Sequence, residues 1–244
     1  MKTFAIGDVH GQFDALQQLL TMLPIDWQQD ELVFLGDLVD RGPASRRVLE
    51  LVQELTSFST RVRVLRGNHE QVMLDSLSSK QSFDQWMRMG GQTTYAEYCP
   101  ANLKRRWLTF LQELPAATRS FLAQLPTYYR NEHAIYVHAG ARRSETGDWQ
   151  IDSLETALWY RDMLFWKEYD GPTIVVGHTP TNKIRKMLNE SLTPNSRMEA
   201  WQRGDIIAID CGAGHNSQLC AVELPTRRFY YRPISRKKRA PWAA

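Results

Sequence analysis

Short runs of apolar residues recur along the chain, and each is followed within three residues by glycine. The runs are apolar nearly throughout rather than alternating, which is typical of strands that are buried on both faces. They cover residues 3–6, 32–35, 62–65, 134–137, 173–176 and 206–209. Residues 219–224 and 228–231, joined by Pro225-Thr226, predict a late antiparallel hairpin.

Helical patterns lie between the early runs. Apolar side chains repeat at helical spacing over residues 13–23 and again over 48–55. Strands that alternate with helices predict a layered α/β fold. Residues 71–130 differ, because their apolar and aromatic side chains fall on helical patterns that are broken by Gly90-Gly91 and three prolines. We expect this segment to be a helical insertion.

Length and composition predict one folded domain. A chain of 244 residues with 43% hydrophobic residues can bury one substantial core, so we expect a single domain over residues 1–232. The formal net charge is only +3, and much of the excess lies in Arg236-Lys237-Lys238-Arg239, so no broad nucleic-acid-binding surface is predicted. Residues 233–244 are expected to form a solvated, flexible basic tail. The alternative role for this tail is electrostatic docking of an acidic partner.

Cysteine usage and hydropathy predict a cytoplasmic protein. The three cysteines, Cys99, Cys211 and Cys220, are odd in number and widely spaced, which does not suggest a disulfide framework. Residues 1–6 run straight into a polar motif and leave no room for a signal peptide. No apolar stretch approaches the ~20 residues of a membrane span. We therefore expect a monomer or weak oligomer with neither membrane nor nucleic acid as a partner.

Polar motifs that contain glycine follow five of the predicted strands. They are Gly7-Asp8-Val9-His10-Gly11, Gly36-Asp37-Leu38-Val39-Asp40-Arg41-Gly42, Gly67-Asn68-His69-Glu70, His138-Ala139-Gly140 and Gly177-His178-Thr179. Because α/β folds place their sites at the carboxyl edge of the sheet, we expect six metal ligands to converge there. The six are Asp8, His10, Asp37, Asn68, His138 and His178. Asp8 and His10 alone would be weak evidence, because a structural Asp–His hydrogen bond has the same spacing.

This ligand set indicates a class of chemistry. Carboxylate, amide and imidazole ligands together suit Mn, Fe or Zn better than Ca. Asp37 has two carboxylate oxygens and can bridge two cations. Two cations roughly 3.5–4 Å apart form the arrangement that hydrolyses phosphate esters, since they lower the pKa of a bound water from ~15.7 toward ~7. The residues alone therefore predict a dinuclear phosphoesterase.

Taken together, these motifs resemble the calcineurin-like metallophosphoesterase superfamily. They are most similar to the phosphoprotein phosphatases, specifically the short bacterial and bacteriophage serine/threonine phosphatases, and Trp86-Met87-Arg88-Met89-Gly90-Gly91 also resembles that bacterial branch. The resemblance implies a four-layer α/β/β/α sandwich of two mixed β-sheets, with the 71–130 insertion beside the site. It also implies hydrolysis of phosphate monoesters by direct attack of a water or hydroxide bound to two metal ions. We expect Mn²⁺, with Fe or Zn as alternatives.

The resemblance further implies a role for each site residue. The first metal would be bound by Asp8, His10 and Asp37. The second metal would be bound by Asp37, Asn68, His138 and His178. His69 would protonate the leaving alkoxide and be oriented by Asp40, and Arg41 and Arg161 would hold phosphate oxygens. A proton donor near a poor leaving group is typically worth ~10²–10⁴ in rate, and guanidinium presents a fork of donors that matches two phosphate oxygens.

Simpler interpretations stay open for several residues. Asp40-Arg41 could be a local ion pair that caps the next helix, and Arg161 could be a surface helix residue. Arg142-Arg143 competes with Arg161 for the phosphate, although it lies in a polar stretch. Glu70 is expected to start a helix and to favour its N-terminal dipole. His215 could line the cleft.

Two enzyme functions are compatible with these motifs. The first is a serine/threonine protein phosphatase, whose substrate is a phosphorylated protein or peptide. The second is a dinucleoside polyphosphate (Ap4A-type) hydrolase of the same fold. Family members of the second kind usually resemble Gly-Asn-His-Asp and often lack the Asp before Arg, so Glu70 and Asp40 favour the monoesterase. A catalytically dead binding module would require the loss of a ligand or of His69, and the sequence shows neither.

Overall fold

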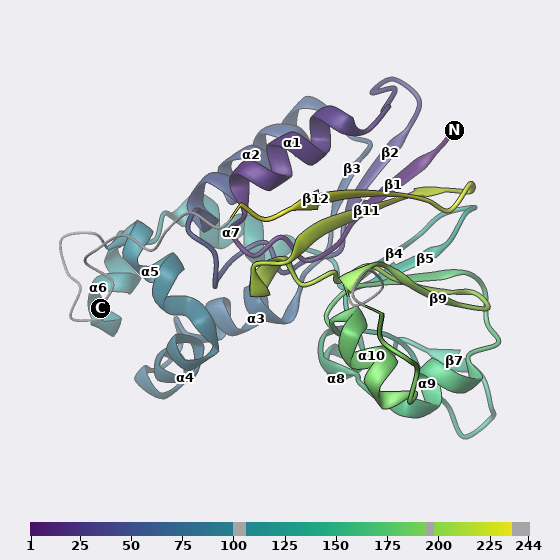
Figure 1. The fold of residues 1–244 in the computed structure, drawn as a ribbon. Coiled ribbons are helices and arrows are strands. Elements are labelled where there is room, and N and C mark those ends of the chain that lie inside the picture. The colour runs from purple at the N-terminus through teal and green to yellow at the C-terminus, as the bar shows by residue number, and fades with distance from the viewer. Residues whose placement is uncertain (100–105, 194–197, 236–244) are drawn as a thin grey trace.

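The computed structural model describes residues 1–99, 106–193 and 198–235. These residues form two five-stranded β-sheets, a two-stranded hairpin and helices around them (Figure 1). The basic run at residues 236–239 lies outside the described residues, as does the rest of 236–244. Among the described residues, no helix is long and apolar enough to cross a membrane.

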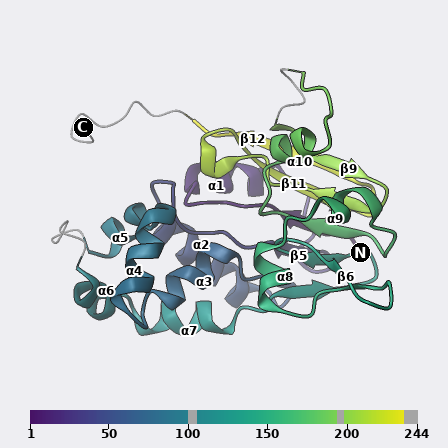
Figure 2. The same ribbon diagram turned by 90° about the horizontal axis from the view of Figure 1, so that it is seen from below.

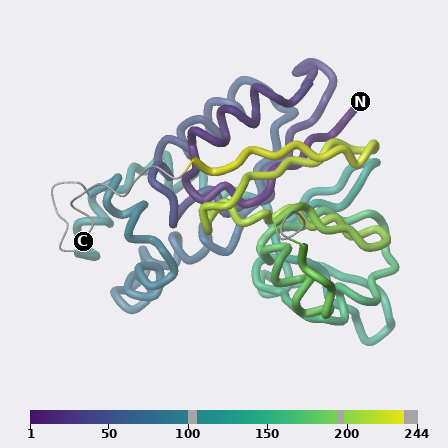
Figure 3. Tube along the Cα trace, viewed as in Figure 1, coloured from purple at the N-terminus to yellow at the C-terminus, as the bar shows by residue number. Residues whose placement is uncertain are grey.

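The first sheet joins the opening strands of the chain to its closing hairpin, in the order β12-β11-β1-β2-β3. Its strands are β1 Thr3–Ile6, β2 Glu31–Phe34, β3 Val62–Val64, β11 Gln218–Leu224 and β12 Arg228–Pro233. β1, β2 and β3 run parallel, whereas β11 is antiparallel to both β1 and β12. Figure 3 shows the purple β1 beside this yellow hairpin. The predicted early strands and late hairpin are confirmed.

The second sheet has the order β4-β5-β8-β10-β9. Its strands are β4 Tyr128–Arg130, β5 Ile135–Val137, β8 Ile174–Val176, β9 Trp201–Arg203 and β10 Ile206–Ala208. The three central strands run parallel, and β4 and β9 pair antiparallel at the edges. The hairpin of β6 Arg142–Arg143 and β7 Trp149–Gln150 stands apart. Sequence patterns missed β4, β6, β7 and β9, because these strands have two or three residues and largely exposed side chains.

Three apolar cores hold the layers together, because successive residues of a strand face opposite sides of its sheet. In β1, Phe4 packs in the core with the helices of the first sheet, whereas Ala5 packs in the core between the sheets. In β8, Val175 belongs to the core between the sheets and Ile174 to the core with the helices of the second sheet. These helices are α1 Phe13–Met22 and α2 Ser45–Phe58 on the first sheet, and α8 Leu154–Trp159, α9 Met163–Glu168 and α10 Thr181–Met187 on the second. The expected α/β/β/α sandwich is confirmed (Figure 1).

Helices also connect β3 to β4 at one end of the sandwich. They are α3 Asn68–Asp75, α4 Lys80–Trp86, the π-helix η1 Met87–Gly91, α5 Gln92–Tyr98, α6 Trp107–Glu113 and α7 Ala116–Gln124. Figures 1 and 2 show α4, α5 and α6 at the opposite end of the molecule from α8 and α9. The bounds differ from the predicted 71–130, because α3 begins at residue 68 and residues 128–130 form β4.

Candidate metal centre and acid–base pair

Nine of the ten predicted site residues lie in the segments that directly follow a strand. Asp8 and His10 follow β1; Asp37, Asp40 and Arg41 follow β2; Asn68 and His69 begin α3 after β3; His138 follows β5 and His178 follows β8. The tenth, Arg161, lies between α8 and α9. The two arginines are exposed and the other eight residues are buried. Nine of the candidate residues therefore lie at the carboxyl ends of the strands.

The backbone of this site is unusual. Five of its residues have positive φ angles, namely His10 (47°), Asp37 (51°), Asp40 (71°), Arg41 (67°) and His178 (62°). Only three other non-glycine residues that the structure describes share this left-handed conformation. Such a conformation costs of order 1–3 kcal/mol per residue and gathers at functional sites. The strand-end loops therefore carry backbone strain at five site residues.

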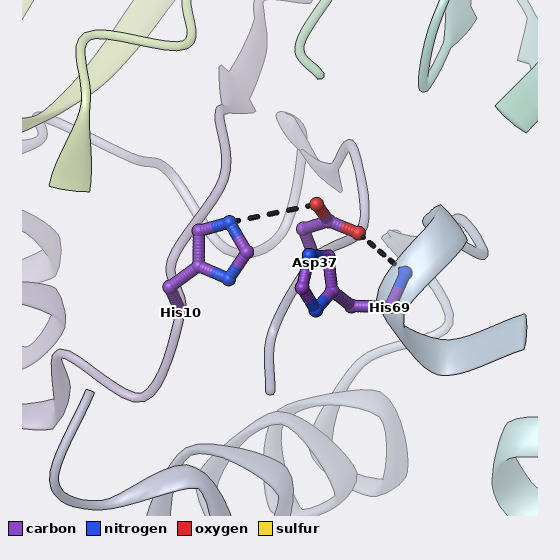
Figure 4. Close-up of side chains that lie close together, drawn as sticks. All are labelled: His10, Asp37 and His69. Atoms are coloured by element: carbon purple, nitrogen blue, oxygen red, sulfur yellow. Dashed lines mark hydrogen bonds and ion pairs between the residues drawn. The ribbon is translucent and has the colours of Figure 1, made fainter. Parts of the chain in front are cut away.

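Asp37 lies at the centre of the ligand set (Figure 4). Its Oδ2 is 3.5 Å from His10 Nε2, and its Oδ1 is 3.4 Å from His138 Nε2. His10 Nδ1 donates to the Val39 carbonyl at 2.9 Å. His138 Nδ1 likewise donates to the Leu35 carbonyl at 3.0 Å. Each imidazole thus uses Nδ1 as its donor and keeps Nε2 near Asp37 as a possible metal ligand.

Two groups of potential ligand atoms share Asp37. The atoms of Asp37, His138 and His178 lie within 4.8 Å of one another, and so do those of Asp37, His10 and His69. Asn68 joins the first of these groups, because its Oδ1 is 3.0 Å from His138 Nε2 and 3.0 Å from His178 Nδ1. These Asp, His and Asn groups could bind two divalent cations with Asp37 between them.

Asp8 belongs to neither of these two groups, and its carboxylate contacts a neighbouring site loop. Its role as a ligand stays a prediction. The buried Asp8 carboxylate accepts the His178 amide, 3.1 Å from each oxygen. Gly177 permits this approach, since a Cβ there would lie 2.2 Å from Asp8 Oδ1. Burial, and then the Asp210 and Asp37 carboxylates, raise the pKa of Asp8 well above its usual value. A cation would relieve this repulsion, so the donor set fits a bound metal ion.

Asp40 and His69 form a buried pair beside Asp37. His69 Nδ1 is 2.8 Å from Asp40 Oδ2. Burial lowers the pKa of His69, but the Asp37 and Asp40 carboxylates outweigh burial and raise it above its usual value. Arg41 reaches both imidazoles, with Nη1 2.8 Å from His10 Nε2 and Nη2 2.9 Å from His69 Nε2. The second nitrogen of His69 therefore faces the same guanidinium as His10.

The structure decides between the simpler interpretations. Arg161 lies outside any helix and donates to the His178 carbonyl at 3.3 Å, so the surface-helix interpretation is wrong. Arg142 is exposed in β6 and pairs with Asp152. The helix-capping interpretation of Asp40-Arg41 is also wrong, because Glu97 accepts the first amides of α2.

Glu70 has a larger role than its sequence position indicated. It lies in the first turn of α3, as expected. Its carboxylate also accepts the amides of Asp37, Leu38 and Gly67, each at 2.8 Å. Glu70 therefore ties the Asp37 loop to the turn that carries Asn68. Helix-start patterns are local and cannot reveal a contact between residues 33 positions apart.

The sequence analysis identified only His215 as a possible site residue in the segment after β10. Asp210 is buried, and burial raises its pKa to about 6. Gly214 packs so closely that a Cβ there would lie 2.4 Å from His10 Cδ2. His215 follows, and its pKa is lowered by partial burial of the imidazole and then by the charge of Arg41. A polar motif after a buried strand was the available signal, since the other site loops share it.

Comparison with known proteins agrees with the fold. Residues 1–211 match the model of the calcineurin-like phosphoesterase family. The chain therefore belongs to this family and is a metallophosphoesterase. The predicted superfamily and fold are thereby confirmed.

The relatives carry two different activities. The chain is 35% identical over 198 residues to serine/threonine-protein phosphatase 1 of Salmonella typhimurium (strain LT2), covering 76% of this chain and 82% of that protein. It is 30% identical over 213 residues to bis(5'-nucleosyl)-tetraphosphatase PrpE of Bacillus mycoides (strain KBAB4), covering 76% and 81%. A solved protein-tyrosine phosphatase of a psychrophilic Shewanella species has a TM-score of 0.60 and 20% identity, covering 96% and 80%, which shows a shared fold.

Proposed function

We propose that this chain is a metal-dependent serine/threonine protein phosphatase that hydrolyses phosphate monoesters. The observation that carries the proposal is the buried Asp40–His69 pair, 2.8 Å apart, beside the metal ligands. The serine or threonine alkoxide is a poor leaving group and needs a proton donor. The 35% identity to a serine/threonine phosphatase supports the same substrate class.

The metal ligands divide into two sets in this proposal. Asp8, His10 and Asp37 would hold one cation, and Asp37, Asn68, His138 and His178 the other. Mn²⁺ suits these mixed oxygen and nitrogen donors, with Fe or Zn as alternatives. When bound, the cations supply an activated water and neutralise phosphate charge.

Arg41 and Arg161 would bind the phosphate oxygens. Arg41 donates to the lone pairs of His10 and His69 at 2.8 and 2.9 Å. A phosphate dianion is a stronger acceptor than a neutral imidazole and would compete for these donors. Burial lowers the pKa of Arg161, and the carboxylates of Asp210, Asp37 and Asp8 oppose this shift. Arg161 therefore lies close to the acidic residues of the site. Two guanidinium groups suit the three terminal oxygens of a monoester.

His69 would donate the proton to the leaving group. Its Nδ1 is held by Asp40, so Nε2 is the nitrogen that is available to a substrate. When Arg41 binds the phosphate instead of His69, the neighbouring Asp37 and Asp40 carboxylates favour the protonated form of the His69 imidazole. As water adds to phosphorus, the P–O bond to the serine or threonine oxygen breaks, and that oxygen takes the Nε2 proton.

The second candidate is a dinucleoside tetraphosphatase, because a relative of that activity is 30% identical to the chain. Its leaving group is a nucleotide phosphate, which departs as a stable anion and has less need of a proton. The buried pair of Asp40 and His69 therefore favours the monoesterase.

The deciding experiment is steady-state hydrolysis by the Mn²⁺-reconstituted protein, with a phosphoserine peptide and diadenosine tetraphosphate as competing substrates. We expect higher kcat/KM for the peptide, and its loss in His69→Ala. Preference for the dinucleotide would contradict the protein phosphatase and establish the second candidate. Arg142→Ala is the control, because this exposed arginine pairs with Asp152.

A further inference from the structure

Two side chains of the helical segment hold Asp40, the carboxylate that orients His69. Trp86 Nε1 is 3.1 Å from Asp40 Oδ1 and 3.0 Å from Oδ2. Thr94 Oγ1 donates to Oδ1 at 2.7 Å. Oδ2 is the oxygen that His69 Nδ1 contacts. Because Asp40 is fully buried, protein groups rather than bulk water set the orientation of its carboxylate.

Packing gives the Trp86 indole a single orientation. The side chain is fully buried, with ring centroids 4.6 Å from Phe110 and 6.0 Å from Phe83. Gly91 lies flat against the ring, since a Cβ there would be 2.5 Å from it. An indole has one donor and no acceptor. Its buried N–H therefore requires an acceptor, and Asp40 supplies both of its oxygens.

Thr94 binds the backbone and the side chain of Asp40 together. Its hydroxyl accepts the Asp40 amide at 3.0 Å while donating to Oδ1. Ser45 Oγ also accepts this amide, at 2.9 Å. Asp40 has a φ of 71°, a conformation that L-residues seldom adopt. The contacts from Thr94 and Ser45 hold it there.

We propose that Trp86 and Thr94 are positioning residues of the reaction, which fix the Asp40 carboxylate so that His69 delivers its proton to the leaving oxygen. The inference rests on the proposed function, because it requires His69 to be the proton donor. If Asp40 could rotate, the imidazole would lose its fixed orientation. Loss of the indole N–H should therefore slow the reactions that need this proton and spare those that do not.

The test compares two monoesters, a phosphoserine peptide that leaves as an alkoxide and 4-nitrophenyl phosphate, whose leaving group is a stable anion. Trp86→Phe keeps an aromatic ring and removes the N–H. We expect about a 10-fold loss of kcat on the peptide, part of the ~10²–10⁴ that a proton donor supplies, and little loss on 4-nitrophenyl phosphate. Bound metal should be unchanged. Thr94→Val should show the same selectivity, and Thr94→Ser should restore wild-type rates.

Two controls separate positioning from packing. Phe83→Leu disturbs the same aromatic cluster without touching Asp40 and should not change the ratio of the two rates. Trp86→Phe combined with His69→Ala should show the ratio of His69→Ala alone. Equal losses on both substrates in Trp86→Phe and Thr94→Val would overturn the inference while leaving the proposed function in place. If the wild-type protein hydrolyses neither monoester, the proposed function is wrong. The present inference is then wrong as well.

Discussion

The strand-end loops and the helical segment between β3 and β4 serve the site in different ways. The loops carry the predicted metal ligands and five left-handed residues. The helical segment packs an aromatic cluster of Phe83, Trp86, Tyr95 and Phe110. Beyond α3, the described residues of this segment form hydrogen bonds with Asp40 and Arg41. The difference indicates that the loops hold the candidate ligands, whereas the helical segment holds the carboxylate that contacts His69. Mutations in the two regions should therefore have different effects.

The largest effect is expected for Asp37→Ala, which removes the carboxylate shared by both ligand groups. Metal content should fall for both cations, and activity should fall by about 10⁴-fold or more. Each cation supplies several kcal/mol of transition-state stabilisation, and 1.36 kcal/mol is tenfold in rate. Elemental analysis with steady-state kinetics measures both. Retention of one full equivalent of metal would show that the two ligand groups are independent.

Next in size are His69→Ala and Asp40→Asn, which act on the proton donor. We expect turnover of a phosphoserine peptide to fall by about 10²-fold or more, with metal content largely unchanged. Turnover should fall because Asp40 contacts His69, the proposed proton donor. Metal content should stay because the other contacts of the Asp40 carboxylate are to Trp86 and Thr94, which are not candidate ligands. Metal analysis of the purified variants is the check. A metal-free His69→Ala protein would instead make His69 a ligand, as its place in the group with His10 and Asp37 allows.

A smaller effect is expected for Arg161→Ala, which acts on phosphate binding. Loss of a charged hydrogen bond costs about 1.5–3 kcal/mol, so kcat/KM should fall by roughly 10-fold or more. Arg142→Ala is the matched control, because Arg142 is exposed and pairs with Asp152. Equal activity of the two variants would exclude Arg161 from the substrate site.

Sequence patterns predicted the strand-end loops better than the helical segment between β3 and β4. The positions of the candidate ligands could be predicted because each follows a buried apolar run, and strand ends meet at one edge of a sheet. Asp8 shows the limit of that argument. Its position after β1 follows from the pattern, whereas the contact of its carboxylate with the His178 amide, across 170 residues, cannot be predicted from local patterns.

For the helical segment, the sequence predicted the helices but not their contacts with the site. Trp86 falls on an apolar helical pattern, and such a tryptophan is ordinarily core. That pattern does not show that its N–H meets Asp40, 46 residues away. The edge strands were missed for another reason, because β4 and β9 are short and largely exposed and depend on pairing with buried neighbours.

The smallest effect concerns the junction between the two regions. Glu97 of α5 accepts the amides of Ser45 and Arg46, 2.7 and 3.0 Å away, at the start of α2. Burial raises the pKa of Glu97 from 4.5 to about 7, although these two amides oppose the shift. Between these values the folded protein binds this proton more tightly than the unfolded chain does. Its contribution to the free energy of unfolding therefore decreases as pH rises from about 4.5 to 7.

Glu97→Gln has no proton to lose at this position, so its free energy of unfolding should decrease less between pH 5 and pH 8 than that of the wild type. Urea unfolding followed by tryptophan fluorescence at both pH values measures the difference. Glu54→Gln is the control, because Glu54 is an exposed carboxylate on α2, and it should follow the wild type. Parallel decreases for wild type and Glu97→Gln would mean that Glu97 is already ionised at pH 5. The helical segment would then be held to α2 by a charged carboxylate at both pH values.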